Sequence, residues 1–296
     1  MYENAISFSG EKMPELPDLV YLEKHLKPLL RGQQIAGIEV HEPIVLRMLL
    51  PGDFAQALAG VKFVDVRRHG PFLVFNLSDQ RDLVIHPMLA GRLQWAAETS
   101  TASASCALTL HCTPSRQNLR YLDDKKMGKI YLTAAGDYDR IPRFNQQGPD
   151  IFSAEFTLDY FQQQIKRNRK QVRVFLMDQS IISCIGNAYA DEILFDAGIH
   201  PKTFCYQLDE AENERLYRAV RDVMQWGIAA VEKAQQPLEI KVREHVRVRN
   251  RKDQACPTCG AKIRRAGVLG YDAFFCPACQ PLKRGQFLDW RELKNK

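Results

Sequence analysis

Four cysteines near the C-terminal end of the chain occur as two Cys-x2-Cys pairs. Cys256 and Cys259 form the first pair, Cys276 and Cys279 form the second, and sixteen residues separate the pairs. Zinc ribbons and zinc hairpins use such spacing to present four thiolates tetrahedrally from two tight turns. We therefore expect one structural Zn²⁺ at these cysteines. Since four protein thiolates would close its coordination shell, the ion should support folding rather than hydrolysis.

Two disulfides or a redox-active Cys-x2-Cys pair are the alternatives for these residues. No basic, apolar and small-residue pattern typical of a secretion signal lies near Met1, so we expect a reducing compartment. The hydrophobic content of 45% and charged content of 26%, without a membrane-spanning apolar run, indicate a folded soluble protein with no membrane partner. The four remaining cysteines are expected to be buried free thiols: Cys106, Cys112, Cys184 and Cys205.

Positive charge is concentrated in two segments of the chain. Residues 166–173 and 241–252 are rich in Lys and Arg, whereas residues 208–214 are acidic, and the net charge is +6. Clustered cations are typical of a surface that binds nucleic-acid phosphates. A solvated basic helix face explains either cluster alone equally well.

The secondary structure predicted to position the cysteines and the basic segments changes along the chain from mainly strands to mainly helices. A helix is predicted from Asp18, and a second and third helix over 155–178 and 208–232, the last with Asp209 and Glu212 as a capping box. Residues 186–192 are predicted to lead into a short helix ending near Gly198. Short Val-, Ile-, Leu- and Phe-rich segments before these helices predict the strands of a sandwich or barrel: 35–47, 61–77, 82–86, 107–112, 119–122 and 128–133.

This pattern predicts an α+β protein of several parts. We expect an N-terminal extension or incorrectly assigned start over 1–12, a β-sandwich domain over 13–144, a helical domain over 145–245, a zinc finger over 246–282, and a tail over 283–296.

Three separated segments together resemble the Fpg/Nei family of DNA glycosylases, which excise oxidised bases. They are MPELPD at 13–18, GNAYADEILFDAGIHP at 186–201, and the finger from CPTCGAKI to CPACQ. The resemblance implies an N-terminal β-sandwich with flanking helices, an all-α helix–two-turn–helix domain and a zinc-finger β-hairpin. It also implies a monomer that binds damaged double-stranded DNA, in the nucleoid-associated cytoplasm if the source is bacterial. A zinc-ribbon transcription or ribosomal factor would explain the finger but not PELPD.

The resemblance makes Pro14 and Glu15 the candidate catalytic residues. The family uses an N-terminal proline as the amine that attacks C1′ of the deoxyribose, and the following glutamate handles proton transfers. An N-terminal amine titrates near about 7.7–8.0, so more of it is nucleophilic at neutral pH than of a lysine. Pro14 can act in this way only without residues 1–13, because a proline nitrogen in a peptide bond is an amide. Asp18 stands where the family commonly has glutamate.

The resemblance also implies DNA contacts. The family inserts three residues into the duplex when the damaged nucleotide is flipped out, and these correspond to Leu89, Lys125 and Met127. Asn187 and His86 match residues that contact phosphates.

Two further departures from the family pattern each remove a cation. Pro71 replaces an expected lysine, and Tyr271 replaces an expected arginine of the finger. Nearby cations could compensate for the lost phosphate contacts: Arg67, Arg68, Arg249, Arg264 and Arg265.

Two functions follow from these residues. The first is a base-excision-repair DNA glycosylase with abasic-site lyase activity, which removes oxidised bases through a Schiff base at Pro14. The alternative is a catalytically impaired, zinc-containing lesion- or abasic-site-binding protein of the same family, favoured by residues 1–12, Pro71 and Tyr271.

Overall fold

The computed structural model describes residues 13–282, so the expectations for 1–12 and 283–296 lie outside the described residues. The described chain forms two compact units. Unit 1 contains Leu22–Ile141 and Pro237–Lys241, together with residues 13–14, and unit 2 contains Glu15–Tyr21, Pro142–Gln236 and residues 242–282. Helix α1 (Leu16–Leu30) contributes residues to both units.

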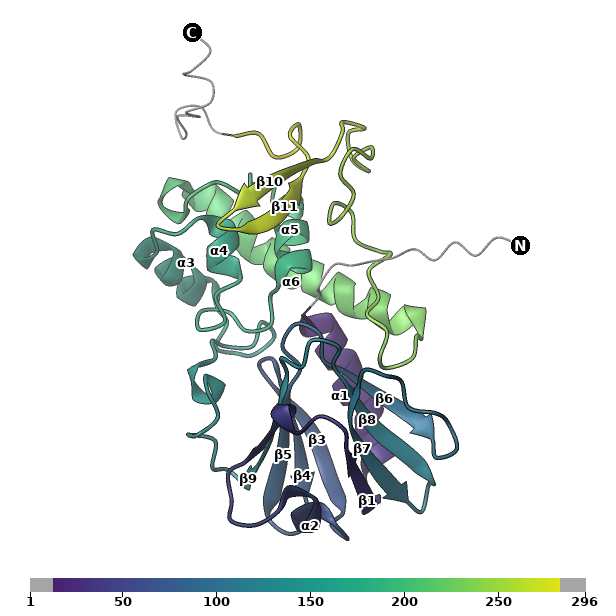
Figure 1. The fold of residues 1–296 in the computed structure, drawn as a ribbon. Coiled ribbons are helices and arrows are strands. Elements are labelled where there is room, and N and C mark those ends of the chain that lie inside the picture. The colour runs from purple at the N-terminus through teal and green to yellow at the C-terminus, as the bar shows by residue number, and fades with distance from the viewer. Residues whose placement is uncertain (1–12, 283–296) are drawn as a thin grey trace, which may run out of the picture. The chain divides into compact units, whose positions relative to one another are not determined.

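Unit 1 is a β-sandwich made of two antiparallel sheets, one of which has a short parallel edge strand (Figure 1). The four-stranded sheet has the order β1 (Gln34–Val40), β7 (Cys106–Thr113), β8 (Gln117–Leu122) and β6 (Arg92–Ala97). The five-stranded sheet has the order β2 (Leu46–Met48), β9 (Lys129–Ala134), β5 (Arg81–His86), β4 (Phe72–Leu77) and β3 (Phe63–His69), and β2 is the parallel strand. The buried apolar core lies between the sheets, and strands β4, β5, β7, β8 and β9 are buried along most of their length. A short helix, α2 (Phe54–Leu58), is capped by Asp53.

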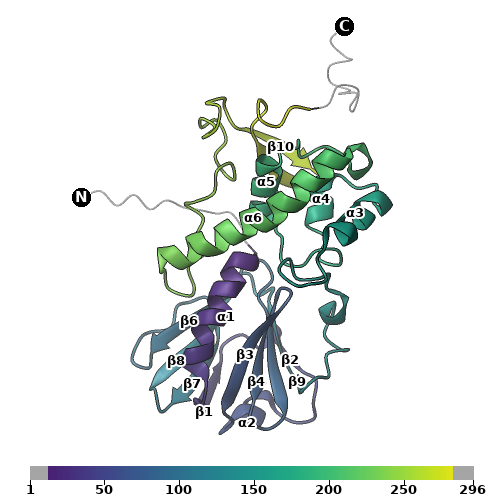
Figure 2. The same ribbon diagram turned by 180° about the vertical axis from the view of Figure 1, so that it is seen from behind.

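Unit 2 is helical, with a two-stranded hairpin at its C-terminal part. Its helices are α3 (Leu158–Arg167), α4 (Val172–Leu176), α5 (Asn187–Asp196) and α6 (Glu210–Ala234), and its hairpin consists of β10 (Arg264–Val268) and β11 (Tyr271–Phe275). Helix α6 packs against α3 and α5 (Figures 1 and 2). The predicted capping box is present, since Asp209 accepts from the Glu212 amide and Glu212 from the Asp209 amide. The α+β class and its three parts are as predicted.

Several element predictions need correction. The predicted helix over 155–178 is two helices, because the backbone near Gln171 is extended and forms a bridge with Phe204. The predicted strand over 61–77 is instead the hairpin β3–β4, which turns at Gly70 and Pro71. The predicted strand over 35–47 is divided into two strands, β1 and β2. Strand β6 was not predicted, and its sequence RLQWAA contains no β-branched residue.

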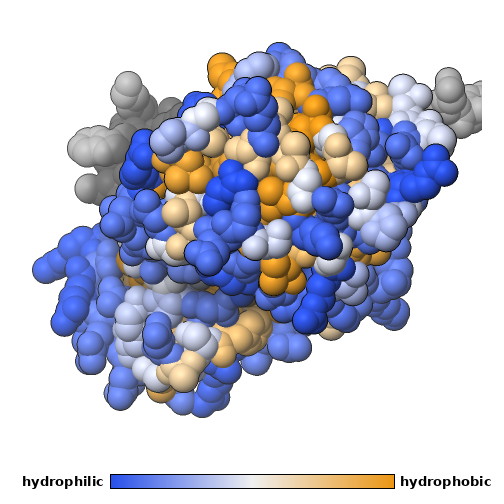
Figure 3. Space-filling model, turned by 90° about the horizontal axis from the view of Figure 1, so that it is seen from below, coloured by the Kyte–Doolittle hydropathy of each residue, from blue (hydrophilic) through white to orange (hydrophobic). Residues whose placement is uncertain are grey.

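The surface is mixed in polarity. Figure 3 shows hydrophilic residues over most of the face in view, with hydrophobic residues scattered among them. None of the helices in residues 13–282 combines the length and the apolar character that crossing a membrane requires. The four cysteines outside the finger are buried free thiols, as predicted.

Candidate active site and zinc centre

The Glu15 side chain caps the N-terminus of α5 within unit 2. Its Oε2 accepts hydrogen bonds from the amides of Gly186 (2.9 Å) and Tyr189 (3.0 Å), and its Oε1 accepts one from Ala188 (3.0 Å). The N-cap residue of α5 is Gly186, which has no side chain to cap the helix. A carboxylate distant in sequence therefore satisfies three amides that the first turn leaves unpaired, at the positive end of the helix dipole.

Gly186 allows this close approach. A Cβ atom on Gly186 would lie 2.7 Å from Glu15 Cδ and 2.8 Å from Cγ, so a larger residue would displace the carboxylate. Glu15 is only 3% exposed, and burial raises its pKa, although Arg243 and the backbone amides act in the opposite direction. A carboxyl group whose pKa lies above its ordinary value is suited to exchanging protons near neutral pH.

Asp18 and Arg243 form a buried pair beside Glu15. Asp18 Oδ1 and Oδ2 accept from Arg243 Nη1 (2.8 Å) and Nη2 (2.5 Å), and Oδ2 also accepts from the Glu15 amide (2.9 Å). Arg243 thus holds the Asp18 carboxylate through a bidentate ion pair, and Asp18 in turn holds the backbone of Glu15 by accepting a hydrogen bond from its amide. Pro14 precedes this arrangement and is buried.

The residues expected to enter the duplex lie on two turns at one end of the five-stranded sheet of unit 1. Leu89 follows β5 and Met127 precedes β9, and the strands are in register because His86 pairs with Lys129. Met127 is 40% exposed, Lys125 is exposed, and Leu89 is half-buried. The structure therefore brings together three residues that are up to 38 positions apart in sequence (89 to 127).

Tyr121 and Asp123 hold these two turns, and the sequence analysis did not identify either. Asp123 is buried and accepts from the amides of Lys125 (3.1 Å) and Gly128 (2.7 Å) and from the Tyr121 hydroxyl (3.3 Å). That hydroxyl occupies the space where a Cβ on Gly91 or Gly128 would lie. The Asp preceding a polar turn in DDKKMG was the available signal, because Asp side chains bind amides two residues ahead.

Buried acidic residues on α5 bind the basic segment 241–252. Glu192 accepts from the amides of Val248 (2.8 Å) and Arg249 (3.0 Å) and forms an ion pair with Arg247 (3.2 Å). Asp191 pairs with Arg249 (2.8 Å) and with the fully buried Arg173 (2.7 Å). Much of the positive charge in this segment is therefore neutralised within unit 2, which the sequence analysis did not anticipate.

The predicted DNA-contact residues of unit 2 differ in their accessibility. Asn187 begins α5, and its Oδ1 accepts from Arg173 Nη2 (2.8 Å). Arg249 is 17% exposed and also donates to the Asp272 carbonyl (2.7 Å). Arg264 and Arg265 are 56% and 53% exposed on β10, each near one acidic residue.

The departures from the family pattern occupy different environments. Pro71 is buried in the β3–β4 turn, whereas Tyr271 is 57% exposed on β11. Of the neighbouring cations in unit 1, Arg67 donates to the Tyr138 hydroxyl (2.7 Å), and Arg68 lies beside it on β3.

The four finger cysteines converge at one point. Their Sγ atoms all lie within 4.8 Å of one another, with 3.8 Å between Cys256 and Cys279 and 3.4 Å between Cys259 and Cys276. Zinc–sulfur bonds of about 2.3 Å in tetrahedral geometry require sulfur separations of about 3.8 Å. The donor set therefore fits the structural Zn²⁺ that the spacing predicts, with no position left for water. Three of the ligands, Cys256, Cys276 and Cys279, pack in a small core with Phe195, Val248, Ile263 and Phe274.

Removal of the zinc is expected to unfold the finger. Cys259→Ser should lower the bound metal well below one zinc per chain and lower the thermal unfolding midpoint, because metal binding contributes directly to folding. Cys205→Ala, at a buried thiol outside the finger, should retain one zinc. Elemental analysis with calorimetry measures both, and full zinc occupancy in Cys259→Ser would contradict the four-thiolate site.

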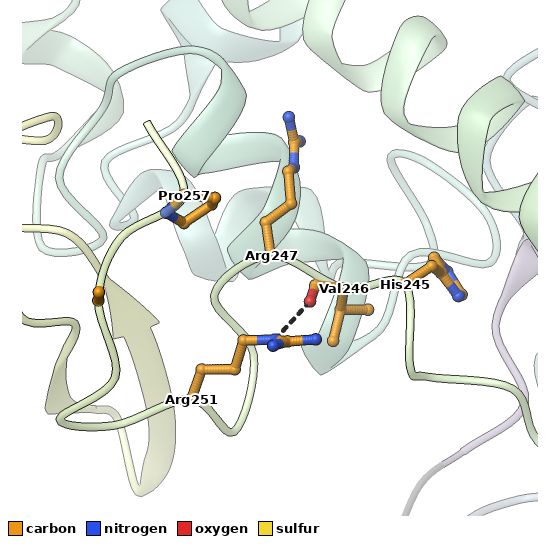
Figure 4. Close-up of a pocket in the computed structure, with 6 residues that line it drawn as sticks. His245, Val246, Arg247, Arg251 and Pro257 are labelled. Atoms are coloured by element: carbon orange, nitrogen blue, oxygen red, sulfur yellow. Dashed lines mark hydrogen bonds between the residues drawn. The ribbon is translucent and has the colours of Figure 1, made fainter. Parts of the chain in front are cut away.

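A shallow pocket of unit 2 lies beside the finger (Figure 4). It is lined by His245, Val246, Arg247, Arg251, Ala255 and Pro257. Arg251 donates to the Val246 carbonyl (2.6 Å), while the Arg247 side chain points away from it. Since its lining holds no acidic side chain and its guanidinium groups are engaged within the chain, this pocket is not the candidate catalytic site.

Three family models match consecutive parts of the chain. The formamidopyrimidine-DNA glycosylase N-terminal domain matches residues 13–130, and the formamidopyrimidine-DNA glycosylase H2TH domain matches residues 147–237. The zinc finger found in FPG and IleRS matches residues 253–282.

Curated relatives and solved structures agree with these matches. The formamidopyrimidine-DNA glycosylase of Pelotomaculum thermopropionicum is 31% identical over 92% of this chain and 100% of its own length, and that of Bacillus subtilis gives the same values. The MutM (Fpg) structure of Thermus thermophilus has a TM-score of 0.80 at 28% identity, covering 91% of this chain and all of that one. The structure of Lactococcus lactis Fpg in complex with DNA containing an abasic site has a TM-score of 0.82 at 26% identity, and the match covers 90% of this chain and 100% of that one. The fold and zinc finger define a DNA-glycosylase-type protein. The chain belongs to the Fpg/Nei family.

Proposed function

We propose that the protein is a base-excision-repair DNA glycosylase with abasic-site lyase activity, which acts on oxidised bases in double-stranded DNA. The observation that carries this proposal is the buried Glu15 carboxylate, held by three amides of the α5 N-terminus directly after Pro14. The family membership supports a DNA glycosylase. The roles of individual residues rest on the arrangement around Glu15.

The proposed reaction proceeds through a covalent intermediate on Pro14. Its secondary amine attacks C1′, the base leaves with its bonding electrons and a proton, and an iminium ion joins the protein to the opened sugar. The iminium acidifies the proton at C2′, whose loss expels the 3′ phosphate, and water then releases the amine. Glu15 supplies and removes protons at the sugar, and its raised pKa suits both steps.

Borohydride trapping on DNA containing an abasic site tests this chemistry. Protein expressed from Met13, from which removal of the methionine exposes Pro14, should form a covalent adduct, because borohydride reduces the iminium to a stable amine. Protein that retains residues 1–13 should form none, since its proline nitrogen is an amide. If the shorter protein binds the DNA but forms no adduct, the lyase proposal fails.

A second candidate function is a lesion-binding protein with impaired catalysis. It is favoured by Pro71, which is buried in a tight turn and offers no amine, and by Tyr271 in place of an arginine. The intact mass of the protein from its native source separates the two functions. A mass that begins at Pro14 supports the enzyme, whereas a mass that includes Met1 supports the binding protein.

Arg264→Ala should weaken binding to all DNA sequences and reduce the slope of log affinity against log salt by about one unit. Arg264 is exposed on the finger, where a guanidinium can replace counterions of the phosphates. Arg116→Ala is the control, because Arg116 is 83% exposed at the opposite end of β8 from the turn that carries Lys125. Equal salt slopes for the parent protein and Arg264→Ala would remove the phosphate-contact assignment.

A further inference from the structure

The tip of the zinc-finger hairpin has an unusual backbone for its sequence. Strands β10 and β11 are in register up to the pair Val268–Tyr271, so the loop is the two residues Leu269 and Gly270. Both have positive φ, +46° and +83°. Positive φ at both central residues is characteristic of a type I′ turn, in which Asn-Gly and Asp-Gly are strongly preferred.

Leucine is poorly suited to this position. A bulky side chain in the left-handed region is strained, whereas asparagine tolerates it. The Leu269 side chain gains no burial in return, because it is 71% exposed. Tyr271, two residues later, is 57% exposed. Single exposed apolar residues are ordinary on protein surfaces. Strain and exposure at one residue, next to an exposed aromatic ring, are not explained by folding of the chain alone.

The surroundings of this tip indicate the chemistry of its partner. The same hairpin carries Arg264 and Arg265 at the end opposite its tip, each near one aspartate. Both arginines are more than half exposed and can turn toward the phosphates of an anionic polymer. An aromatic ring and cations carried by one surface hairpin form a combination with which proteins bind unpaired nucleobases, since every base offers a face for stacking. Tyr271 also stands where a cation was expected to bind phosphate, so the contact here is apolar rather than ionic.

We propose that Leu269 and Tyr271 form an apolar contact with an unstacked nucleobase of distorted DNA, and that this contact contributes to the recognition of damaged sites. The inference rests on the proposed function, because it requires that damaged duplex DNA is the ligand. Tyr271 stacks on the base face, and Leu269 packs against the adjoining sugar or base step, as apolar side chains do in opened DNA.

Leu269→Asn is the sharpest test, because its expected effects on stability and on DNA binding are opposite in direction. Asparagine relieves the strain of the turn, so the thermal unfolding midpoint should stay equal or rise. Affinity for a duplex carrying a tetrahydrofuran abasic analogue should nevertheless fall several-fold, while affinity for the intact duplex is unchanged. A loss of binding in this variant cannot be assigned to unfolding.

Tyr271 variants separate stacking from charge. Tyr271→Ala should weaken binding to the analogue duplex by about tenfold, the loss of one aromatic–base stack, with the salt slope unchanged. Tyr271→Phe should retain the parent affinity, because the ring remains. A reduced salt slope in Tyr271→Ala would instead indicate an ionic role and overturn the proposal.

The parent protein provides the reference for these outcomes. If it neither binds the analogue duplex nor releases a base, the proposed function fails and this inference fails with it. If the parent is active and both Leu269→Asn and Tyr271→Ala bind like it, only the inference is overturned. Sedimentation would reveal a third outcome, a dimer that Leu269→Asn abolishes, which would overturn the inference by assigning the tip to a second copy of the chain.

Discussion

Glu15→Gln is expected to lower the rate of base release by about 10²–10⁴-fold, the usual contribution of a positioned general acid or base. The glutamine amide cannot exchange protons with the sugar at any accessible pH. Burial raises the pKa of Glu15 above the ordinary value of a glutamate. The limb of the pH–rate profile that reflects the titration of this carboxyl should disappear in the variant. Single-turnover kinetics on damaged DNA across pH measures both effects.

A structural effect must be separated from this catalytic one. In the parent protein, three amides donate to the two oxygens of the Glu15 carboxylate. Because glutamine offers them only one carbonyl oxygen, the variant will lose some stability. Asp209→Ala is a matched control, because it removes an anionic N-cap from α6 in the same unit at a cost of about 1 kcal/mol. The control should retain activity below its unfolding temperature. Base release within a few-fold of the parent in folded Glu15→Gln would refute the proton-transfer role.

The sequence was sufficient to predict features that depend on local spacing. The zinc ligands are two short pairs, and the cap of α6 spans three residues, so each carries its own signal. The helix over 155–178 was predicted as continuous because Ile165 and Val172, the apolar residues on either side of the polar stretch 168–171, are seven positions apart, which is a helical spacing. Pairing of this segment with residues near Phe204, more than thirty positions later, overrides that local preference.

Contacts between distant residues could not be predicted in the same way. The basic segment 241–252 has the charge pattern of a phosphate-binding face, yet its arginines bind acids at 18, 191, 192 and 196. Those acids are 51 to 225 residues away, so only the tertiary fold identifies the pairs. Asp191 and Glu192 stand inside the apolar stretch AYADEILF, and acids surrounded by apolar residues on a helix are a usable sign of buried ion pairs.

The buried Asp191 leads to the second large expected effect, which concerns stability. Asp191→Leu should lower the free energy of unfolding by about 3–5 kcal/mol, because it leaves Arg173 charged, fully buried and without its carboxylate. Glu214→Ala removes the acidic partner of the exposed Arg218 on α6 and should cost no more than about 0.5 kcal/mol. Chemical denaturation of each variant at equal zinc occupancy measures the difference.

A double variant tests the physical cause of this loss. Arg173→Met with Asp191→Leu removes both fully buried charges, while Arg249, which is 17% exposed, can turn its guanidinium toward water. If an uncompensated buried charge causes the loss, the double variant should be more stable than Asp191→Leu alone. Equal or lower stability of the double variant would instead assign the loss to the hydrogen bond from the Phe274 amide to Asp191 (3.2 Å). In that case Asp191 would act mainly by joining α5 to the zinc-finger hairpin, and its replacement should also reduce zinc affinity.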